Sequence, residues 1–398
     1  MLSHVFDSGR CVPSIYQTLT INKEVDMGKT RLWIGILLAL ILIIPSTSFA
    51  KEAVPGVTDT EVVVGWTTPL SGPAALWGVT GLGAKAWADY INDQGGIHGR
   101  KIKVDVMDDG YNPTRAMVNL QQMKGKVFAV CGLLGTAVLH AAKDFFPENK
   151  IPLITAYGDI RIWARMPKDQ LRYIFIAYPD YEDEAIYITD YAANKLNAKK
   201  IGLFYQNDDY GKEGLVGAEE ELGKLGMKLV AAVSVEPLDT DLSSHCMKLK
   251  AAEPDVVINW LLPKHGAIIL GTAAKLGFNP QWMTTSTLSD IPIMYKISKG
   301  LFKDVIFVTF AELPDSQDPL MQKYHDAQKK FAANDRWGIF FYAGFYFVEP
   351  MVEGLKRCGR DLTVDNFVKA MDSIKAVSYT HLRAHETVLD LVCRLLLE

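Results

Sequence analysis

The stretch LSGPAALWG at residues 70–78 decides the fold, because it lies between a strand pattern and a helix pattern. The apolar run VVVGW at residues 62–66 precedes it, and a helical pattern follows and closes on the turn-rich NDQGGIHGR at residues 92–100. Proteins of the α/β class place ligands at the loops that follow their strands. This first unit therefore indicates capture of a solute rather than catalysis.

Strand and helix patterns continue to alternate along the chain, with short connections rich in Gly, Pro and Asn. One helix is predicted to open with Asn112 as its cap and Pro113 at its first position. Such alternation is typical of a parallel sheet covered on both faces. Residues 51–376 are too many for one ordinary core, so two lobes are expected. Strands are predicted at residues 62–66, 102–107, 127–131, 151–155, 201–205, 228–235, 255–261 and 282–285.

Several of these segments resemble the type I periplasmic solute-binding proteins of ABC importers, in the branched-chain amino acid (leucine/isoleucine/valine) group. The segments are residues 70–100, KKIGL and YQNDDYG between residues 199 and 211, and VEGLKRCGRDLT at residues 352–363. The resemblance runs from about residue 57 to residue 376. It implies an α/β fold of two doubly wound parallel-sheet lobes joined by a multi-strand hinge.

The resemblance also implies that each lobe is discontinuous in sequence. The chain is expected to cross between lobes near Pro179, near Phe310 and after a long helix at residues 341–357. The first lobe would then hold residues 51–178 and 310–357, and the second lobe residues 179–309 and 358–376.

Residues 27–50 have the pattern of a signal peptide. A short basic segment, MGKTR, is followed by an apolar run at residues 32–44 and by STSFA, which predicts cleavage after Ala50. A membrane anchor is the competing interpretation, but the run is too short to span a bilayer comfortably. No cysteine follows Ala50, so a lipid anchor is not expected. These features predict a free periplasmic protein.

The two ends of the chain do not fit the pattern of the rest. Residues 1–26 show neither helical nor strand periodicity, so they are interpreted as a spurious upstream extension, with Met27 as the true start. Residues 377–398 resemble translated sequencing-adapter read-through. They are predicted to be a non-native tail that replaces the true C-terminus.

Composition excludes some classes of function. A hydrophobic content of 49% and a charged content of 22% describe an ordinary globular protein, and the net charge of −4 argues against nucleic acid, which calls for a basic stripe. Cysteines Cys131, Cys246 and Cys358 remain once the ends are set aside. Their odd number leaves open a disulfide or isolated thiols.

The solute is expected to bind between the lobes, beside the loop GLLGT at residues 132–136. Thr136 is predicted to cap the helix that follows, where unpaired N–H groups favour an anion. By resemblance, the carboxylate-binding hydroxyl of the family falls on Thr136; the alternative is a plain helix cap. In the next loop, Asp159 falls near a threonine of the family, where a carboxylate would suit an ammonium or a neutral donor. It is equally a turn or helix cap.

Residues of the second lobe complete the expected site. By resemblance, Tyr210 closes over the ligand, a second cleft tyrosine falls near Leu262, and the acidic residue for an α-amino group falls on Ser286. Trp77 and Trp337 are expected as pocket walls, although both suit a core equally well. The expected ligand-binding residues are Trp77, Leu134, Gly135, Thr136, Tyr157, Gly158, Asp159, Tyr210, Leu262, Ser286 and Trp337.

A serine cannot neutralise an ammonium, so an aliphatic amino acid is doubtful as the solute unless Asp159 takes its place. A small carboxylate, an aromatic acid or an amide is at least as credible. The expected partners are this solute and the permease subunits of an ABC importer, with the mature protein a soluble monomer.

An enzyme, a cytoplasmic ligand sensor and a receptor ectodomain of the same fold are the rival interpretations. The sequence shows no nucleophile–base pair, no phosphate loop and no metal-ligand spacing. No catalytic residue, metal or cofactor is therefore expected.

Overall fold

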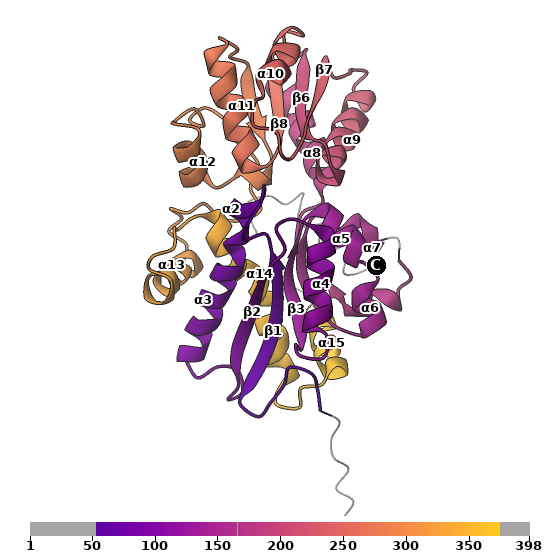
Figure 1. Ribbon diagram of the computed structural model, residues 1–398, viewed down its shortest axis with the longest axis vertical. Coiled ribbons are helices and arrows are strands. Elements are labelled where there is room, and N and C mark those ends of the chain that lie inside the picture. The colour runs from indigo at the N-terminus through magenta and orange to yellow at the C-terminus, as the bar shows by residue number, and fades with distance from the viewer. Residues whose placement is uncertain (1–52, 165, 375–398) are drawn as a thin grey trace, which may run out of the picture. The chain divides into compact units, whose positions relative to one another are not determined.

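The computed structural model describes residues 53–164 and 166–374, which form two α/β lobes (Figure 1). Each lobe is built on a five-stranded sheet, and every pair of neighbouring strands is parallel. The predicted fold class is thus confirmed. The predicted signal peptide, the start at Met27 and the tail at residues 377–398 lie outside the described residues.

The sheet of lobe 1 has the order β2-β1-β3-β4-β5. Its predicted strands all form, and the two-residue β5 is an addition. Lobe 1 contains β1 (Glu61–Thr68), α2 (Ala75–Gly78), α3 (Thr80–Asp93), β2 (Lys101–Asp108), α4 (Pro113–Met123), β3 (Ala129–Leu134), α5 (Thr136–Ala142), α6 (Phe145–Asn149), β4 (Leu153–Tyr157), α7 (Arg161–Ala164), η1 (Gln170–Tyr173), β5 (Ile174–Phe175), α13 (Pro319–Phe331), α14 (Ile339–Cys358) and α15 (Val364–Asp372).

The sheet of lobe 2 has the order β10-β9-β8-β6-β7. Again the predicted strands form, and the short β10 extends the sheet beside β9. Lobe 2 contains α8 (Tyr181–Asp190), a π-helical turn η2 (Tyr191–Lys195), β6 (Ile201–Gln206), α9 (Asp209–Lys224), β7 (Ala231–Val235), α10 (Ser243–Lys250), β8 (Val256–Trp260), α11 (Pro263–Lys275), β9 (Gln281–Thr284), η3 (Ser286–Leu288), α12 (Ile291–Ile297) and β10 (Ile306–Phe307).

Side chains of β1, which lies between β2 and β3, enter cores on both faces of the lobe 1 sheet. Val64 and Trp66 belong to the core that also holds Trp87 of α3 and Phe345 of α14. Val63, which points the other way, packs against the core under α4 and α5. A parallel sheet needs this cover on both faces, since its inner strands are apolar on both faces. With both faces covered by helices, the carboxyl ends of the strands remain accessible, and polar residues that bind ligands are expected there.

The start of α4 confirms the predicted cap. Asn112 has an extended backbone and its side chain accepts a hydrogen bond from the N–H of Arg115, while Pro113 occupies the first turn. The predicted cap at Thr136 was wrong. Gly135 is the capping residue of α5, with a φ of 103° that favours glycine, so Thr136 is the first residue inside the helix.

The predicted assignment of residues 358–376 to lobe 2 was also wrong, as far as residue 374. Helix α15 packs against α14, and its Phe367 meets Phe128 of lobe 1 edge-to-face, with ring centroids 5.1 Å apart. Arg172 of lobe 1 also bonds Asp365 at 2.8 Å. The apolar face of the amphipathic helix α15 is buried there, so this segment belongs to lobe 1.

Cys131 and Cys246 are buried free thiols, and Cys358 is partly exposed. Within the described residues, no helix combines the length and the apolar character that crossing a membrane requires.

A close contact between α3 and α14 generates a prediction about stability. A Cβ atom added at Gly83 would lie 1.9 Å from the carbonyl oxygen of Phe341, and no side chain can move to relieve that clash. We expect Gly83→Ala to lower Tm by at least about 2 °C, because overpacking costs about 1–3 kcal/mol. Thermal unfolding followed by circular dichroism would measure the change.

The matched control is Gly271→Ala in α11, where no atom lies within 4 Å of the added Cβ. Alanine is the better helix former, so Tm should stay level or rise slightly. Equal Tm values for Gly83→Ala and the unchanged protein would contradict the close packing of α3 on α14.

Candidate functional site

An aromatic cavity lies between the lobes, where the carboxyl ends of lobe 1 strands meet the start of α9 and the loop before α11. It encloses about 20 Å³, which is room for about one water molecule. A larger solute therefore needs the lobes to separate before it enters. The lining residues are Trp77, Tyr111, Leu134, Gly135, Thr136, Tyr157, Tyr178, Tyr181, Tyr210, Leu262 and Thr287.

Trp77 ties the two lobes together at this cavity. Its indole Nε1–H donates a hydrogen bond of 3.0 Å to the carbonyl oxygen of Thr287 in lobe 2. The ring also lies 4.6 Å from that of Phe340 and 6.1 Å from that of Phe310, centroid to centroid. Trp77 thus combines an apolar wall with a directional bond between the lobes.

Tyrosine hydroxyls form the polar part of the cavity. The hydroxyl of Tyr157 is 2.7 Å from that of Thr80, and the hydroxyl of Tyr210 is 2.6 Å from that of Thr287. Burial raises the pKa of Tyr157 and of Tyr210 well above the usual value, so both stay neutral. The cavity therefore offers hydroxyl donors and acceptors rather than charges.

Seven of the eleven predicted residues line this cavity. Two more, Gly158 and Asp159, lie against the lining residue Thr136. A Cβ atom added at Gly158 would lie 2.9 Å from the backbone nitrogen of Thr136, and the Asp159 N–H donates to the Thr136 hydroxyl at 3.0 Å. The residues that line it are Trp77, Leu134, Gly135, Thr136, Tyr157, Tyr210 and Leu262.

Ser286 is buried close to the cavity but does not line it. Its N–H and its hydroxyl donate to the two carboxylate oxygens of Glu184, at 2.6 and 2.7 Å. Burial raises the pKa of Glu184 to about 7, against the opposing effect of these two bonds. The sequence places no acid at 286, yet the fold brings one there from α8.

Trp337 lies away from the cavity, so its predicted place as a pocket wall was wrong. Its indole donates to the carbonyl oxygen of Pro314, and its ring contacts those of His325 and Tyr342 in tilted arrangements, each with centroids 4.8 Å apart. These contacts hold it in the connection between α13 and α14. Phe310 stacks on Trp77 instead.

Four lining residues, three of them tyrosines, are not among those predicted from the sequence. Tyr178 and Tyr181 belong to the segment YPDY at the first crossing between the lobes, and Tyr111 follows the Asp-Asp-Gly turn after β2. Two tyrosines around a predicted crossover were the available signal, since a crossover borders the cleft. Thr287 carried no such signal.

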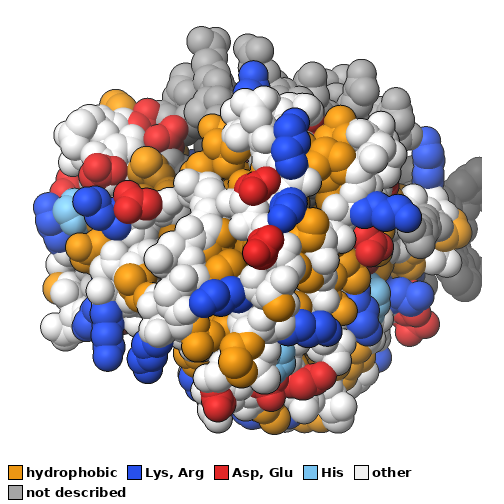
Figure 2. Space-filling model, turned by 90° about the horizontal axis from the view of Figure 1, so that it is seen from above, with side chains coloured by type: hydrophobic (Ala, Val, Ile, Leu, Met, Phe, Trp, Pro, Cys, Tyr) orange, Lys and Arg blue, Asp and Glu red, His pale blue; other side chains and the backbone are white. Residues whose placement is uncertain are grey.

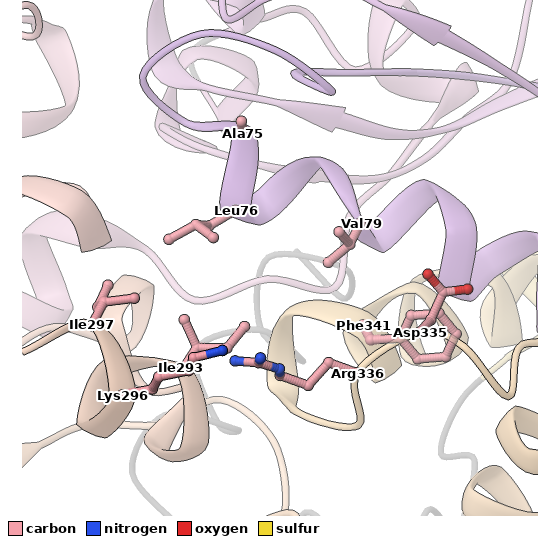
Figure 3. Close-up of a pocket in the computed structure, with 9 residues that line it drawn as sticks. All are labelled: Ala75, Leu76, Val79, Ile293, Lys296, Ile297, Asp335, Arg336 and Phe341. Carbon is pink, nitrogen blue, oxygen red and sulfur yellow. The ribbon is translucent and has the colours of Figure 1, made fainter. Parts of the chain in front are cut away.

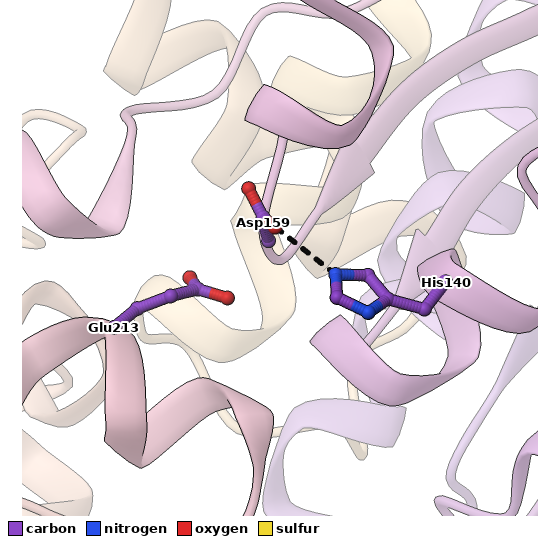
Figure 4. Close-up of side chains that lie close together, drawn as sticks. All are labelled: His140, Asp159 and Glu213. Carbon is purple, nitrogen blue, oxygen red and sulfur yellow. Dashed lines mark hydrogen bonds and ion pairs between the residues drawn. The ribbon is translucent and has the colours of Figure 1, made fainter. Parts of the chain in front are cut away.

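Side chains able to bind a metal approach one another at the edge of the cleft (Figure 4). Donor atoms of His140, Asp159 and Glu213 all lie within 4.8 Å of one another, and Glu213 comes from lobe 2. His140 Nε2 lies 3.0 Å from Asp159, and its Nδ1 lies 3.9 Å from Asp209 of lobe 2. The histidine is therefore already paired with carboxylates, and we assign no metal to the group.

Comparison with known proteins identifies the family. The sequence profile of the family described as "Periplasmic binding protein" matches residues 61–388, which include part of the segment predicted to be a tail. The chain belongs to this family.

Relatives of this periplasmic binding protein carry names of amino-acid-binding proteins. The Leu/Ile/Val-binding protein homolog 3 of Brucella melitensis is 29% identical over 200 residues, which are 50% of this chain and 53% of the relative. The chain spans about half the length of the curated relatives that it matches at 29% identity.

Solved structures show the same fold. The fatty acid ABC transporter substrate-binding protein of Thermomonospora curvata has a TM-score of 0.74 and 22% identity, over 82% of this chain and 84% of that one. The branched-chain amino acid transporter substrate-binding protein LivJ of Streptococcus pneumoniae, in complex with isoleucine, has a TM-score of 0.69 and 20% identity, over 80% and 89%. These likenesses establish the type I periplasmic binding fold.

Glu213 generates a prediction about pH. Burial, with the nearby charges of Asp159 and Asp180, raises its pKa from 4.5 to about 10. Between these values the folded binding protein holds a proton that the unfolded chain has released, so stability falls as the pH rises through this window. Glu213→Gln removes the ionisation, and its Tm should exceed that of the unchanged protein by at least about 2 °C at pH 8, with a smaller difference at pH 5.

The control is Glu219→Gln, an exposed position on the same helix, which should behave like the unchanged protein at both pH values. Differential scanning calorimetry gives both differences. A Glu213→Gln variant that is less stable at pH 8 would show that Glu213 is ionised and favourably paired.

Proposed function

We propose that this chain is an exported solute-binding receptor, which captures a small solute between its lobes and delivers it to the permease subunits of an ABC importer. The supporting observation is the aromatic cavity, whose walls come from both lobes and are joined by the bond from Trp77 to Thr287. Such a site binds tightly only when both lobes reach the solute, so binding and hinge closure are coupled.

The signal-peptide pattern and the family both support a place outside the cytoplasm, in the periplasm. Figure 2 shows Lys and Arg side chains interspersed with Asp, Glu and apolar ones over one face of the described chain. That face carries no continuous basic stripe, which agrees with a small-molecule ligand rather than nucleic acid.

The lining of the cavity supports a solute with an apolar, flat body and one polar head. None of the described lining residues is an acid, a lysine, an arginine or a histidine. A zwitterionic amino acid would have both charges buried without an ionic partner, which costs several kcal/mol. An aromatic carboxylic acid or amide needs fewer partners, and hydroxyls such as that of Tyr210 can supply them.

Glu184 is a buried acid close to the cavity, but its oxygens already accept hydrogen bonds from Ser286. A binding role also accounts for the site better than catalysis does. No cysteine is among the described residues that line the cavity. Burial raises the pKa of the Cys131 thiol of β3 well above the usual value, which leaves this thiol unreactive.

The test is calorimetric titration with benzoate, benzamide and leucine. We expect benzoate or benzamide to bind and leucine to bind more weakly, and saturation at about 100 times Kd should raise the free energy of unfolding by about 2.7 kcal/mol. Tyr210→Ala should weaken binding at least tenfold, because it removes a wall and a hydroxyl of the cavity.

The control variant is Tyr187→Ala, whose side chain is 39% exposed on α8 and should leave affinity unchanged. Tighter binding of leucine than of either aromatic solute would contradict the proposed solute class while supporting a receptor. Recovery of a chemically altered solute would contradict a binding role altogether.

A further inference from the structure

A second hollow lies between the lobes, on the other side of α2 from the aromatic cavity. Trp77 lines the cavity, whereas its neighbours Leu76 and Val79 line this hollow, so α2 separates the two. Its volume of about 310 Å³ is within the range of small-molecule sites, although near the lower end. We name it the α2–α12 groove.

The walls of the α2–α12 groove are apolar and come from both lobes. Leu76 and Val79 project from lobe 1 toward Ile293 and Ile297 on α12 of lobe 2, and Phe341 lies at one end (Figure 3). These side chains offer no hydrogen bonds, so the part of a ligand that lies along them must be apolar.

Two cationic side chains line the groove, one from each lobe. Lys296 of α12 and Arg336 of the α13–α14 connection are both exposed, and neither forms an ion pair with a carboxylate of the described residues. Figure 3 shows the guanidinium of Arg336 pointing toward α12, while the carboxylate of Asp335 lies at the other end, beside Phe341. The end near α12 therefore carries two cations, offset in part by the buried carboxyl of Asp290 at the start of α12, and the end near Phe341 carries the carboxylate of Asp335.

We propose that the α2–α12 groove binds a monocarboxylate with an apolar chain. Its carboxylate lies between Lys296 and Arg336, where charge-assisted hydrogen bonds are strong, and its chain lies along the wall formed by Leu76 and Ile293. A second carboxylate at the far end of the chain would meet Asp335, so a dicarboxylate of similar length is disfavoured.

Such a ligand touches both lobes and so stabilises the arrangement that holds them together. By linkage, it changes the affinity for the solute in the aromatic cavity, and the solute changes the affinity for it by the same factor. The groove is thus an effector site that biases closure. This inference goes beyond the solute-binding function and does not depend on which solute the cavity takes.

The test uses octanoate as the probe and octanedioate as its dicarboxylate counterpart, with binding measured by calorimetry on the full chain. We expect octanoate to bind at least tenfold more tightly than octanedioate. The double variant Lys296→Gln/Arg336→Gln should lose at least tenfold in octanoate affinity, whereas Lys303→Gln, an exposed lysine outside the groove, should lose nothing.

Tyr210→Ala separates the groove from the cavity. Octanoate binding that survives Tyr210→Ala and is lost in the double variant supports the groove. Loss in Tyr210→Ala with full binding by the double variant overturns it, since octanoate would then occupy the solute cavity. Absence of octanoate binding up to millimolar concentration also overturns it, and leaves the solute-binding function to its own titration.

Discussion

The contact made by Trp77 is the constraint on which the interface between the lobes depends. Its indole N–H bonds a carbonyl of lobe 2, while its ring packs against Phe340 and Tyr157 of lobe 1. The Trp77 side chain is 2% exposed, so its hydrogen bond is shielded from water, and water does not compete for the indole N–H. Because Trp77 lies on the four-residue α2, the Gly-Pro loop that precedes this helix sets where the two lobes meet.

Charge opposes the closure that the aromatic contacts favour. Glu213 of lobe 2 approaches Asp159 of lobe 1, and Arg161 is already shared among Asp180, Glu182 and Asp183. Partly buried like charges repel, and the protein meets this cost by holding Glu213 protonated. Ionisation of Glu213 would restore this repulsion, so the edge opposes the aromatic contacts between the lobes more strongly as the pH rises.

The sequence predicted the elements that depend on local patterns. The strands, the Asn112 cap and the loops after β3 and β4 follow from apolar runs, a capping residue and Gly-rich turns, which act within a few residues. It could not predict that α8 brings Glu184 to Ser286, since these residues are 102 positions apart. The same holds for α15, whose apolar face suits either lobe until the core beside Phe128 is formed.

The aromatic residues illustrate the same limit. Trp337 and Trp77 are equally large and apolar, and the pattern around each is compatible with a core or with a cleft. What separates them is the hydrogen-bond partner that the fold supplies to each indole: a carbonyl of Pro314 in one case and of Thr287 across the cleft in the other. The hydroxyl pairs of the cavity also satisfy one another, so a solute gains affinity only where it replaces these bonds with better ones. Selectivity at this site therefore rests on hydrogen-bond exchange among neutral groups, a property that no single position in the sequence reveals.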